Sequence, residues 1–258
     1  MTARTGRRDH VPSPPGIRAV LFDVDYTLIR PGPVFDVEGY VRNGRRFGLT
    51  LDPERWPLAQ RAAWEAVERR RAANGHEHDM SLIPAVTRAV VSALAGEEAC
   101  RSTPEACEAC ARYQADQWWD LANFTVFEDV QPCLKRLRSA SMKIGLVSNT
   151  NRDLQAVTTH FGLGPYVDVA IASVDVGVMK PEPQIFLACL DRLGCGPEAA
   201  AMVGDNEYDD MRGALAAGFA LAVLLDRRGR QRKLAERGEP VHAPAIESLD
   251  ELPALLGL

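Results

Sequence analysis

Two aspartates separated by one residue follow an apolar run near the start of the chain. The run Ala19–Phe22 has the composition of a strand buried in a parallel sheet, and Asp23 and Asp25 come directly after it. Residues two apart in a strand share a face, so a turn at the strand end would let both carboxylates reach one site. Open α/β sheets bind ligands at this edge. A structural cation or a helix cap would use the same pair.

A second polar group has the residue types of an anion-binding turn. Ser148, Asn149 and Thr150 stand at the end of the apolar run 143–148. A hydroxyl and exposed backbone N–H groups near a helix start suit the oxygens of a phosphoryl group. The same residues could instead cap the helix that follows.

Charged side chains occupy two more such positions. Lys180 stands just before a proline-initiated helix, and Asp205, Asp209 and Asp210 follow the apolar run 199–204. Taken singly, these are an ordinary surface lysine and an ordinary acidic cap. Their shared position after predicted strands is the stronger indication, because the carboxyl ends of parallel strands meet at one edge of a sheet.

The elements that must position these residues alternate along the second half of the chain. From residue 127 onward, strand-length apolar runs alternate with amphipathic segments, which predicts a doubly wound parallel sheet. The expected strands are 143–148, 167–173, 199–204 and 220–225, and the expected helices are 130–139, 152–161, 183–193, 209–217 and 249–256.

The segment between the first strand and this alternating region is different in character. Arg30-Pro31-Gly32-Pro33 breaks regular structure and marks a hinge. The pattern after it is helical, with helices expected at 34–47, 53–73, 82–94 and 103–121. We therefore expect a disordered tail at 1–16, a Rossmann-like α/β core formed by 17–32 and 125–258, and an inserted all-α cap domain at 33–124.

Composition excludes several classes of protein. With 258 residues, 46% of them hydrophobic, the chain can bury a sizeable globular core. A net charge of −5 argues against nucleic-acid binding, which needs a basic surface. No apolar run approaches the roughly 20 residues that span a bilayer, and the N-terminus lacks the apolar stretch of an export signal. We expect a cytoplasmic protein without nucleic-acid or membrane partners.

Two groups of potential metal ligands have simpler explanations. Cys107 and Cys110 have the spacing of half a zinc site, but the other ligands are missing and small cysteines pack well in a helix. His76 and His78 lie between predicted helices and are interpreted as part of an exposed loop.

Together the four polar groups, in this order and in these strand contexts, resemble the motif set of the haloacid dehalogenase superfamily. The first group reads Asp23-Val24-Asp25-Tyr26-Thr27, which is similar to the D-x-D-x-T signature of that superfamily. Most of its members are magnesium-dependent phosphatases with a Rossmann-like core. The resemblance is good over 17–25 and 127–225, whereas the insertion matches the cap of the superfamily in position and helical character only.

The resemblance implies roles for the carboxylates. Asp23 would be the nucleophile that attacks phosphorus and forms an aspartyl-phosphate, which water then hydrolyses. Asp25 would protonate the leaving alcohol and later deprotonate the attacking water. The cofactor would be Mg²⁺, held by Asp23, the backbone carbonyl of Asp25, Asp205 and water molecules.

The resemblance also assigns the supporting residues. Ser148, the backbone N–H groups around Asn149, and Lys180 would hold the phosphoryl oxygens. Thr27 would orient the first loop by hydrogen bonding, and Asp210 would hold Lys180 or metal-bound water. Whether Asp209 shares that role stays open.

Two positions bear on the branch of the superfamily. Tyr26 stands where glycine is frequent, so we expect altered access or a substrate contact there. Dehalogenases that resemble this family have a non-acidic residue at the position of Asp25, so an acid there favours phosphate esters over haloacids.

We therefore expect a phosphomonoester hydrolase acting on a small phosphorylated metabolite. A phosphomutase on the same scaffold and a noncatalytic binding protein that keeps the fold are the alternatives. The sequence leaves the identity of the ester, the role of the cap residues and the oligomeric state open.

Overall fold

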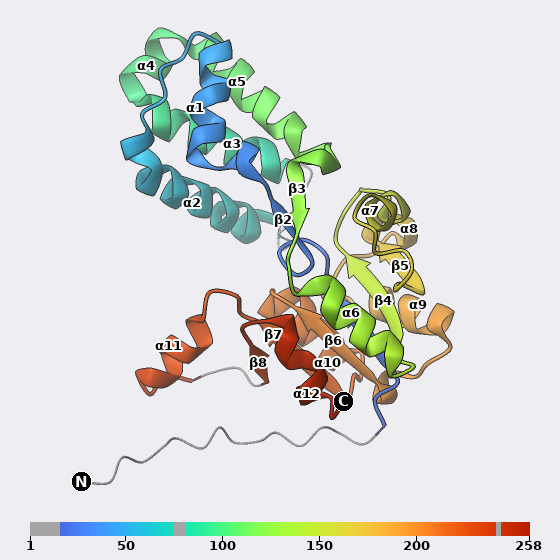
Figure 1. Ribbon diagram of the computed structural model, residues 1–258. Coiled ribbons are helices and arrows are strands. Elements are labelled where there is room, and N and C mark those ends of the chain that lie inside the picture. Colours follow the sequence, from blue (N-terminus) through green and yellow to red (C-terminus); the bar gives the residue numbers. More distant parts are fainter. Residues whose placement is uncertain (1–15, 75–80, 241–243) are drawn as a thin grey trace, which may run out of the picture. The chain divides into compact units, whose positions relative to one another are not determined.

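The computed structural model in Figure 1 describes residues 16–74, 81–240 and 244–258. Residues 1–15 of the tail predicted at 1–16, and the predicted loop at His76 and His78, lie outside these ranges. The chain divides into two units, one ending at Ile29 and resuming over Val126–Leu258, the other comprising Arg30–Thr125. Among the described helices, none has the length and apolar character needed to cross a membrane.

A six-stranded sheet forms the centre of the first unit. Its order is β5-β4-β1-β6-β7-β8, and neighbouring strands run parallel. The strands are β1 Ala19–Phe22, β4 Lys143–Ser148, β5 Val169–Ala172, β6 Ala200–Gly204, β7 Leu221–Leu225 and β8 Ala245–Ile246. The central strands β1 and β6 are buried throughout, as expected of strands covered on both faces. The predicted Rossmann-like parallel sheet is confirmed.

Helices pack on this sheet (Figure 1) and leave the carboxyl ends of its strands for polar residues. The helices are α6 Val130–Ser139, α7 Leu154–His160, α8 Ser173–Val176, α9 Pro183–Leu193, α10 Gly213–Ala216, α11 Arg230–Glu236 and α12 Leu252–Leu255. α6 and α9 both pack on β4. The approach of α9 is close, because a Cβ at Gly145 would stand 2.6 Å from the sulfur of Cys189.

The register of the sheet aligns the ends of three strands. Phe22, the last residue of β1, lies across from Leu146 of β4 and Val203 of β6. β4 ends two residues later at Ser148 and β6 one residue later at Gly204. The residues that follow β1, β4 and β6 therefore reach the same edge of the sheet.

The predicted helix at 209–217 has a different local structure. Residues Glu207–Arg212 form one turn of π-helix, and only Gly213–Ala216 is α-helical. The backbone N–H groups of Asp210 and Met211 both donate to the carbonyl of Asn206, at 2.9 and 3.4 Å. The bond from Met211 spans five residues, and such i→i+5 bonds widen the turn.

The second unit is helical apart from the strands at its ends. Its helices are α1 Val37–Arg46, α2 Trp56–Asn74, α3 Leu82–Ala95, α4 Glu97–Ser102 and α5 Pro104–Asp116. Tyr40, Val91 and Cys110 belong to its apolar core. Its buried polar side chains include Asn43, whose amide donates to Gln114 Oε1 at 2.8 Å. The all-α character of the insertion follows the prediction.

The two ends of the insertion meet in a short two-stranded sheet. β2 Ile29–Pro31 pairs with β3 Phe124–Val126, and Gly32 N donates to Asn123 O at 2.7 Å. A Cβ at Gly32 would stand 2.9 Å from that carbonyl oxygen, so the close approach requires glycine. The predicted break at residues 30–33 is therefore partly a strand, and the second unit, Arg30–Thr125, includes the range 33–124 expected for the inserted domain.

Candidate active site

Lys180 is buried at the sheet edge between two carboxylates. Its Nζ donates to Asp23 Oδ1 at 2.5 Å and to Asp210 Oδ1 at 2.6 Å, and its side chain is only 3% exposed. Asp23 follows β1, while Asp210 stands in the π-helical turn after β6. An ordinary surface lysine is excluded by this burial. The ammonium ion joins two strand ends that are far apart in the sequence.

The backbone of Lys180 is held by the side chain of Asn149. Asn149 Nδ2 donates to Lys180 O at 2.9 Å, and Lys180 N donates to Asn149 Oδ1 at 2.7 Å. Both residues are buried. The amide of Asn149 therefore fixes the position of the lysine, a role that was not foreseen when its backbone N–H was predicted to bind phosphate.

Gly204 gives Asp210 room at the end of β6. A Cβ at Gly204 would stand 2.1 Å from Asp210 Oδ2, a distance no carbon atom can occupy. The same Asp210 oxygen accepts from Asn206 N at 3.0 Å. Asp209, the neighbour whose role was left open, is also buried, and its carboxylate accepts from Asn206 Nδ2 at 3.2 Å. Of the two acids, Asp210 is the one bonded to Lys180.

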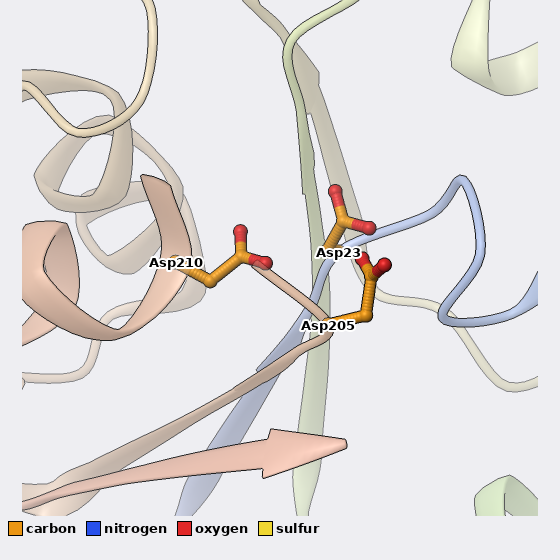
Figure 2. A group of neighbouring side chains, drawn as sticks. All are labelled: Asp23, Asp205 and Asp210. Carbon is orange, nitrogen blue, oxygen red and sulfur yellow. The ribbon is translucent and has the colours of Figure 1, made fainter. Parts of the chain in front are cut away.

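Three carboxylates converge at this point, and we call Asp23, Asp205 and Asp210 the acidic cluster (Figure 2). One oxygen from each lies within 4.8 Å of the others. Carboxylate oxygens at this spacing are a donor set for a hard cation such as Mg²⁺. The predicted metal ligands Asp23 and Asp205 are thus adjacent, whereas the side chain of Asp25 is not part of the group.

The charges of the acidic cluster are only partly balanced. Burial raises the pKa of Asp205 well above its ordinary value, and the charges of Asp23 and Asp210 add to the shift. Burial likewise raises the pKa of Asp210 to about 7, although Lys180 opposes the shift. Burial alone would lower the pKa of Lys180, but Asp210 and Asp23 raise it above its usual range. Three acids around one lysine leave room for further positive charge, so the residues present fit a divalent cation.

Asp25 has a cation of its own. Arg152 Nη1 lies 2.7 Å from Asp25 Oδ1 and 3.0 Å from Oδ2. The two side chains are 6% and 19% exposed, so the ion pair is largely withdrawn from solvent. Burial raises the pKa of Asp25 above its ordinary value, while the charge of Arg152 opposes the shift.

Tyr26 has a left-handed backbone conformation. Its φ is 63°, a region that non-glycine residues rarely adopt, and its N–H donates to Ile29 O at 2.7 Å. This conformation explains why glycine is frequent at the position. The residue as a whole is 45% exposed. Burial raises the pKa of its hydroxyl, and the charges of Asp25 and Asp205 raise this pKa further. Its predicted contact with substrate stays a prediction.

The capping explanations for the polar groups do not hold. α7 is capped by Asp153, whose carboxylate accepts from Gln155 N and Ala156 N, and not by the buried Ser148. The turn after β6 is capped by the Asn206 side chain and not by Asp205. These polar groups at the sheet edge are therefore not needed to start the helices that follow them.

A second buried ionic group holds the loop that follows β1. Asp129 accepts from Arg227 Nη1 at 2.8 Å and Nη2 at 3.0 Å, from Ser248 Oγ at 2.9 Å and from Leu249 N at 2.8 Å, and we call these four residues the Asp129 cluster. Arg227 Nη2 also donates to Thr27 O at 2.8 Å. The Thr27 hydroxyl is buried without a hydrogen-bond partner among the described residues, so its orienting role stays a prediction.

The cysteines of the second unit are packed within its helices. Cys107 and Cys110 are buried, and Cys107 Sγ lies 2.8 Å from Cys100 Sγ. Within the described residues, the group of three or more potential ligands close enough to share a metal is the acidic cluster. The half zinc site suggested by the cysteine spacing is therefore not completed there.

Two arginines of the site region were missed by sequence reasoning. Arg152 was interpreted only as the start of the helix expected at 152–161, and Arg227 was assigned no role. Both are partly or fully buried and paired with acids. The only feature of the sequence that could have indicated them is their position. Arg152 stands shortly after the end of β4, and Arg227 stands shortly after the end of β7.

Comparisons with known proteins agree with this geometry. The profile of the haloacid dehalogenase-like hydrolase family matches residues 17–218. Human N-acylneuraminate-9-phosphatase is 27% identical over 93% of this chain and 94% of its own length.

Two solved structures are similar over nearly the whole chain. A haloacid dehalogenase-type phosphatase from Thermococcus onnurineus is 28% identical with a TM-score of 0.58, covering 93% of this chain and 98% of its own. A 2-haloacid dehalogenase from Pseudomonas syringae is 27% identical with a TM-score of 0.53 and the same coverage. The similarity thus extends to proteins named for two different reactions.

Proposed function

Because the chain belongs to the haloacid dehalogenase-like hydrolase family, we propose that it is a Mg²⁺-dependent phosphomonoester hydrolase. It acts on a small phosphorylated metabolite through an aspartyl-phosphate on Asp23. The observation that carries the proposal is the acidic cluster, in which three carboxylates converge and two of them contact the buried ammonium ion of Lys180. A dianionic phosphate can be bound at such a place only with additional positive charge.

The residues present can hold that charge. Asp23, Asp205 and the backbone carbonyl of Asp25 would bind the ion, with Asp210 close enough to contribute. When bound, Mg²⁺ neutralises charge on the carboxylates and on the phosphoryl oxygens. Lys180 and Ser148 then contact phosphoryl oxygens, and the Asn149 side chain keeps Lys180 in place.

The reaction has two steps. In the first, an oxygen of Asp23 forms a bond to phosphorus while the bond to the leaving oxygen breaks, and Asp25 gives its proton to that oxygen. In the second, Asp25 takes a proton from water as the water oxygen attacks phosphorus and releases Asp23. The attacking oxygen belongs to the carboxylate of Asp23, which Lys180 Nζ holds in place by a hydrogen bond to Oδ1.

Asp25 supports the phosphatase over the dehalogenase named among the similar structures. In the resemblance described above, dehalogenases lack an acid at this position. Here the acid is present and is held by Arg152 near the acidic cluster. Halide leaves a haloacid as an anion and needs no proton. The alkoxide of a phosphate ester is a poor leaving group and needs a proton from an acid such as Asp25.

The test is phosphate release from p-nitrophenyl phosphate and from a panel of metabolite phosphates, with Mg²⁺ and with EDTA. We expect activity with Mg²⁺ only, and a loss of more than about 10³-fold in Asp23→Asn. Asp191→Asn, an exposed change of the same type in α9, is the matched control and should keep full activity. Acid-quenched wild-type enzyme should carry phosphate on Asp23.

Other outcomes would contradict the proposal. Wild-type turnover by Asp23→Asn would exclude the aspartyl-phosphate. Phosphate that moves to another position of the substrate without being released would indicate a phosphomutase. Chloride release from 2-chloropropionate, with no turnover of any ester, would indicate a dehalogenase, and binding without turnover of either class would indicate a noncatalytic protein.

A further inference from the structure

We propose that Arg152 is a positioning residue that sets where the carboxyl group of Asp25 stands for proton transfer to the leaving oxygen. The inference rests on the function proposed above and deepens it by assigning the residue that controls the acid. Arg152 belongs to none of the four sequence motifs, and it enters the argument only through its geometry.

The contact between the two residues is short and shielded. A single nitrogen, Nη1, contacts both oxygens of the Asp25 carboxylate, at 2.7 and 3.0 Å. Arg152 is 8% exposed as a whole residue. Guanidinium stays charged at all working pH values, and an ion pair with so little exposure is screened far less than a surface pair. The contact therefore restricts the carboxyl group to one place.

The two partners differ in how they are anchored. Asp25 lies in the loop after β1, next to Tyr26 in its left-handed conformation. Arg152 N donates to Thr150 Oγ1 at 3.1 Å, and Thr150 exchanges hydrogen bonds of 3.0 and 3.2 Å with the Ser173 hydroxyl at the end of β5. The turn that carries Arg152 is thus held by hydrogen bonds to Ser173. From this turn the arginine side chain reaches the loop after β1.

The two catalytic acids consequently have separate cations. Lys180 contacts Asp23 and Asp210, whereas Arg152 contacts Asp25. The two carboxylates, which are separated by one residue in the sequence, therefore do not share a partner. Asp23 belongs to the acidic cluster, whereas Asp25 contacts the arginine in the turn before α7.

The proposal predicts an effect that depends on the leaving group. Proton donation matters greatly for an alkoxide and little for p-nitrophenolate, which leaves readily as an anion. In Arg152→Met, kcat for an alkyl phosphate should fall at least about 10-fold more than kcat for p-nitrophenyl phosphate. A residue that only stabilised the fold would lower both rates equally.

Two further variants sharpen the test. Arg152→Lys should recover part of the alkyl phosphate rate, because a single nitrogen makes both contacts and an ammonium ion can replace it. Asp25→Asn has already lost the acid. Adding Arg152→Met to this variant should therefore leave the ratio of the kcat values for the two esters unchanged. Arg138→Met removes an arginine paired with Asp168 at the surface and is the matched control, with no change expected for either ester.

The experiment measures both esters with purified wild type and variants, alongside thermal unfolding of each. An equal loss on both esters, or none, overturns the role of Arg152 while leaving the hydrolase intact. If Arg152→Met does not fold, the ratio of the two rates in Arg152→Lys decides, and a wild-type ratio overturns the proposal. A wild type that releases phosphate from neither ester, nor from the metabolite panel, overturns the proposed function itself.

Discussion

Two buried ionic clusters lie in the same unit, and they differ in how well their charges balance. The acidic cluster places three carboxylates around Lys180. The Asp129 cluster places one carboxylate against one arginine, with a hydroxyl and a backbone N–H completing its hydrogen bonds. The Asp129 cluster is somewhat more exposed than the Lys180–Asp210 pair, but the main difference between the two clusters is their composition.

The pKa shifts of the two clusters have opposite signs. The pKa values of Asp205 and Asp210 are raised, first by burial and then by neighbouring carboxylates. Burial also acts to raise the pKa of Asp129, but the hydrogen bonds from Arg227 and Leu249 outweigh it and the net shift is downward. A satisfied cluster stabilises the fold, whereas an unsatisfied one indicates a site that is completed by a ligand.

The largest effect on stability is expected from breaking the balanced cluster. Asp129→Asn leaves the partly buried Arg227 without its counter-ion and should lower the free energy of unfolding by about 3 kcal/mol. Urea unfolding followed by circular dichroism measures the change. Glu247→Gln, which removes the partner of Arg232 in an exposed pair of the same unit, should change it by less than about 1 kcal/mol. Equal effects of the two changes would contradict the comparison.

The opposite sign is expected from removing one acid of the unbalanced cluster. Asp205→Asn relieves repulsion among three carboxylates and should raise the free energy of unfolding of the metal-free protein by about 1 to 2 kcal/mol at pH 7. The same variant should lose Mg²⁺-dependent activity. Destabilisation by this change would show that the acidic cluster is structural, as the Asp129 cluster is.

The last effect is the dependence of stability on pH. Asp210 has a pKa of about 7 in the folded chain against 3.8 as its ordinary value. Between these values the folded state binds more protons than the unfolded state, so stability falls as pH rises. We expect a decrease of about 2 kcal/mol from pH 5 to pH 7 in metal-free protein.

Two controls accompany the pH measurement. The decrease of the free energy of unfolding with pH should be shallower in Asp205→Asn, because one repelling charge is gone. Saturating Mg²⁺ should abolish the decrease at pH 7 and above. The Asp129 cluster has the reverse dependence: since the pKa of Asp129 is lowered, its contribution is present above the ordinary value of 3.8 and is lost as pH falls through the folded pKa. Stability that rises steadily from pH 5 to pH 8 without metal would contradict the assignment.

The sequence predicted the elements that rest on apolar patterning. Helices 130–139 and 183–193 and strand 143–148 have the predicted bounds, because their apolar periodicity is uninterrupted and their ends carry turn residues. The π-helical turn at Glu207–Arg212 was not foreseen, because it depends on a carbonyl shared by two N–H groups. The two-residue strand β8 is too short to leave a pattern.

The site was predictable in its residues more than in its contacts. Lys180 and Asp210 were named because they follow strands, and they do meet at the sheet edge. Arg152 could not be found in this way, since its role depends on a side chain reaching the loop of another strand. Likewise, the bonds of the Asn149 amide to the backbone of Lys180 span 31 positions and leave no local signal.

The short sheet of β2 and β3 makes the inserted unit a separable module. Its first and last residues, Arg30 and Thr125, are joined by a side-chain hydrogen bond of 3.4 Å, and Gly32 bonds to Asn123. The host fold therefore has to span only one strand spacing, whatever length of chain is inserted there, and it bears little additional loop-closure entropy. The length of the chain inserted at this junction can therefore change without a change in the distance that the sheet has to span.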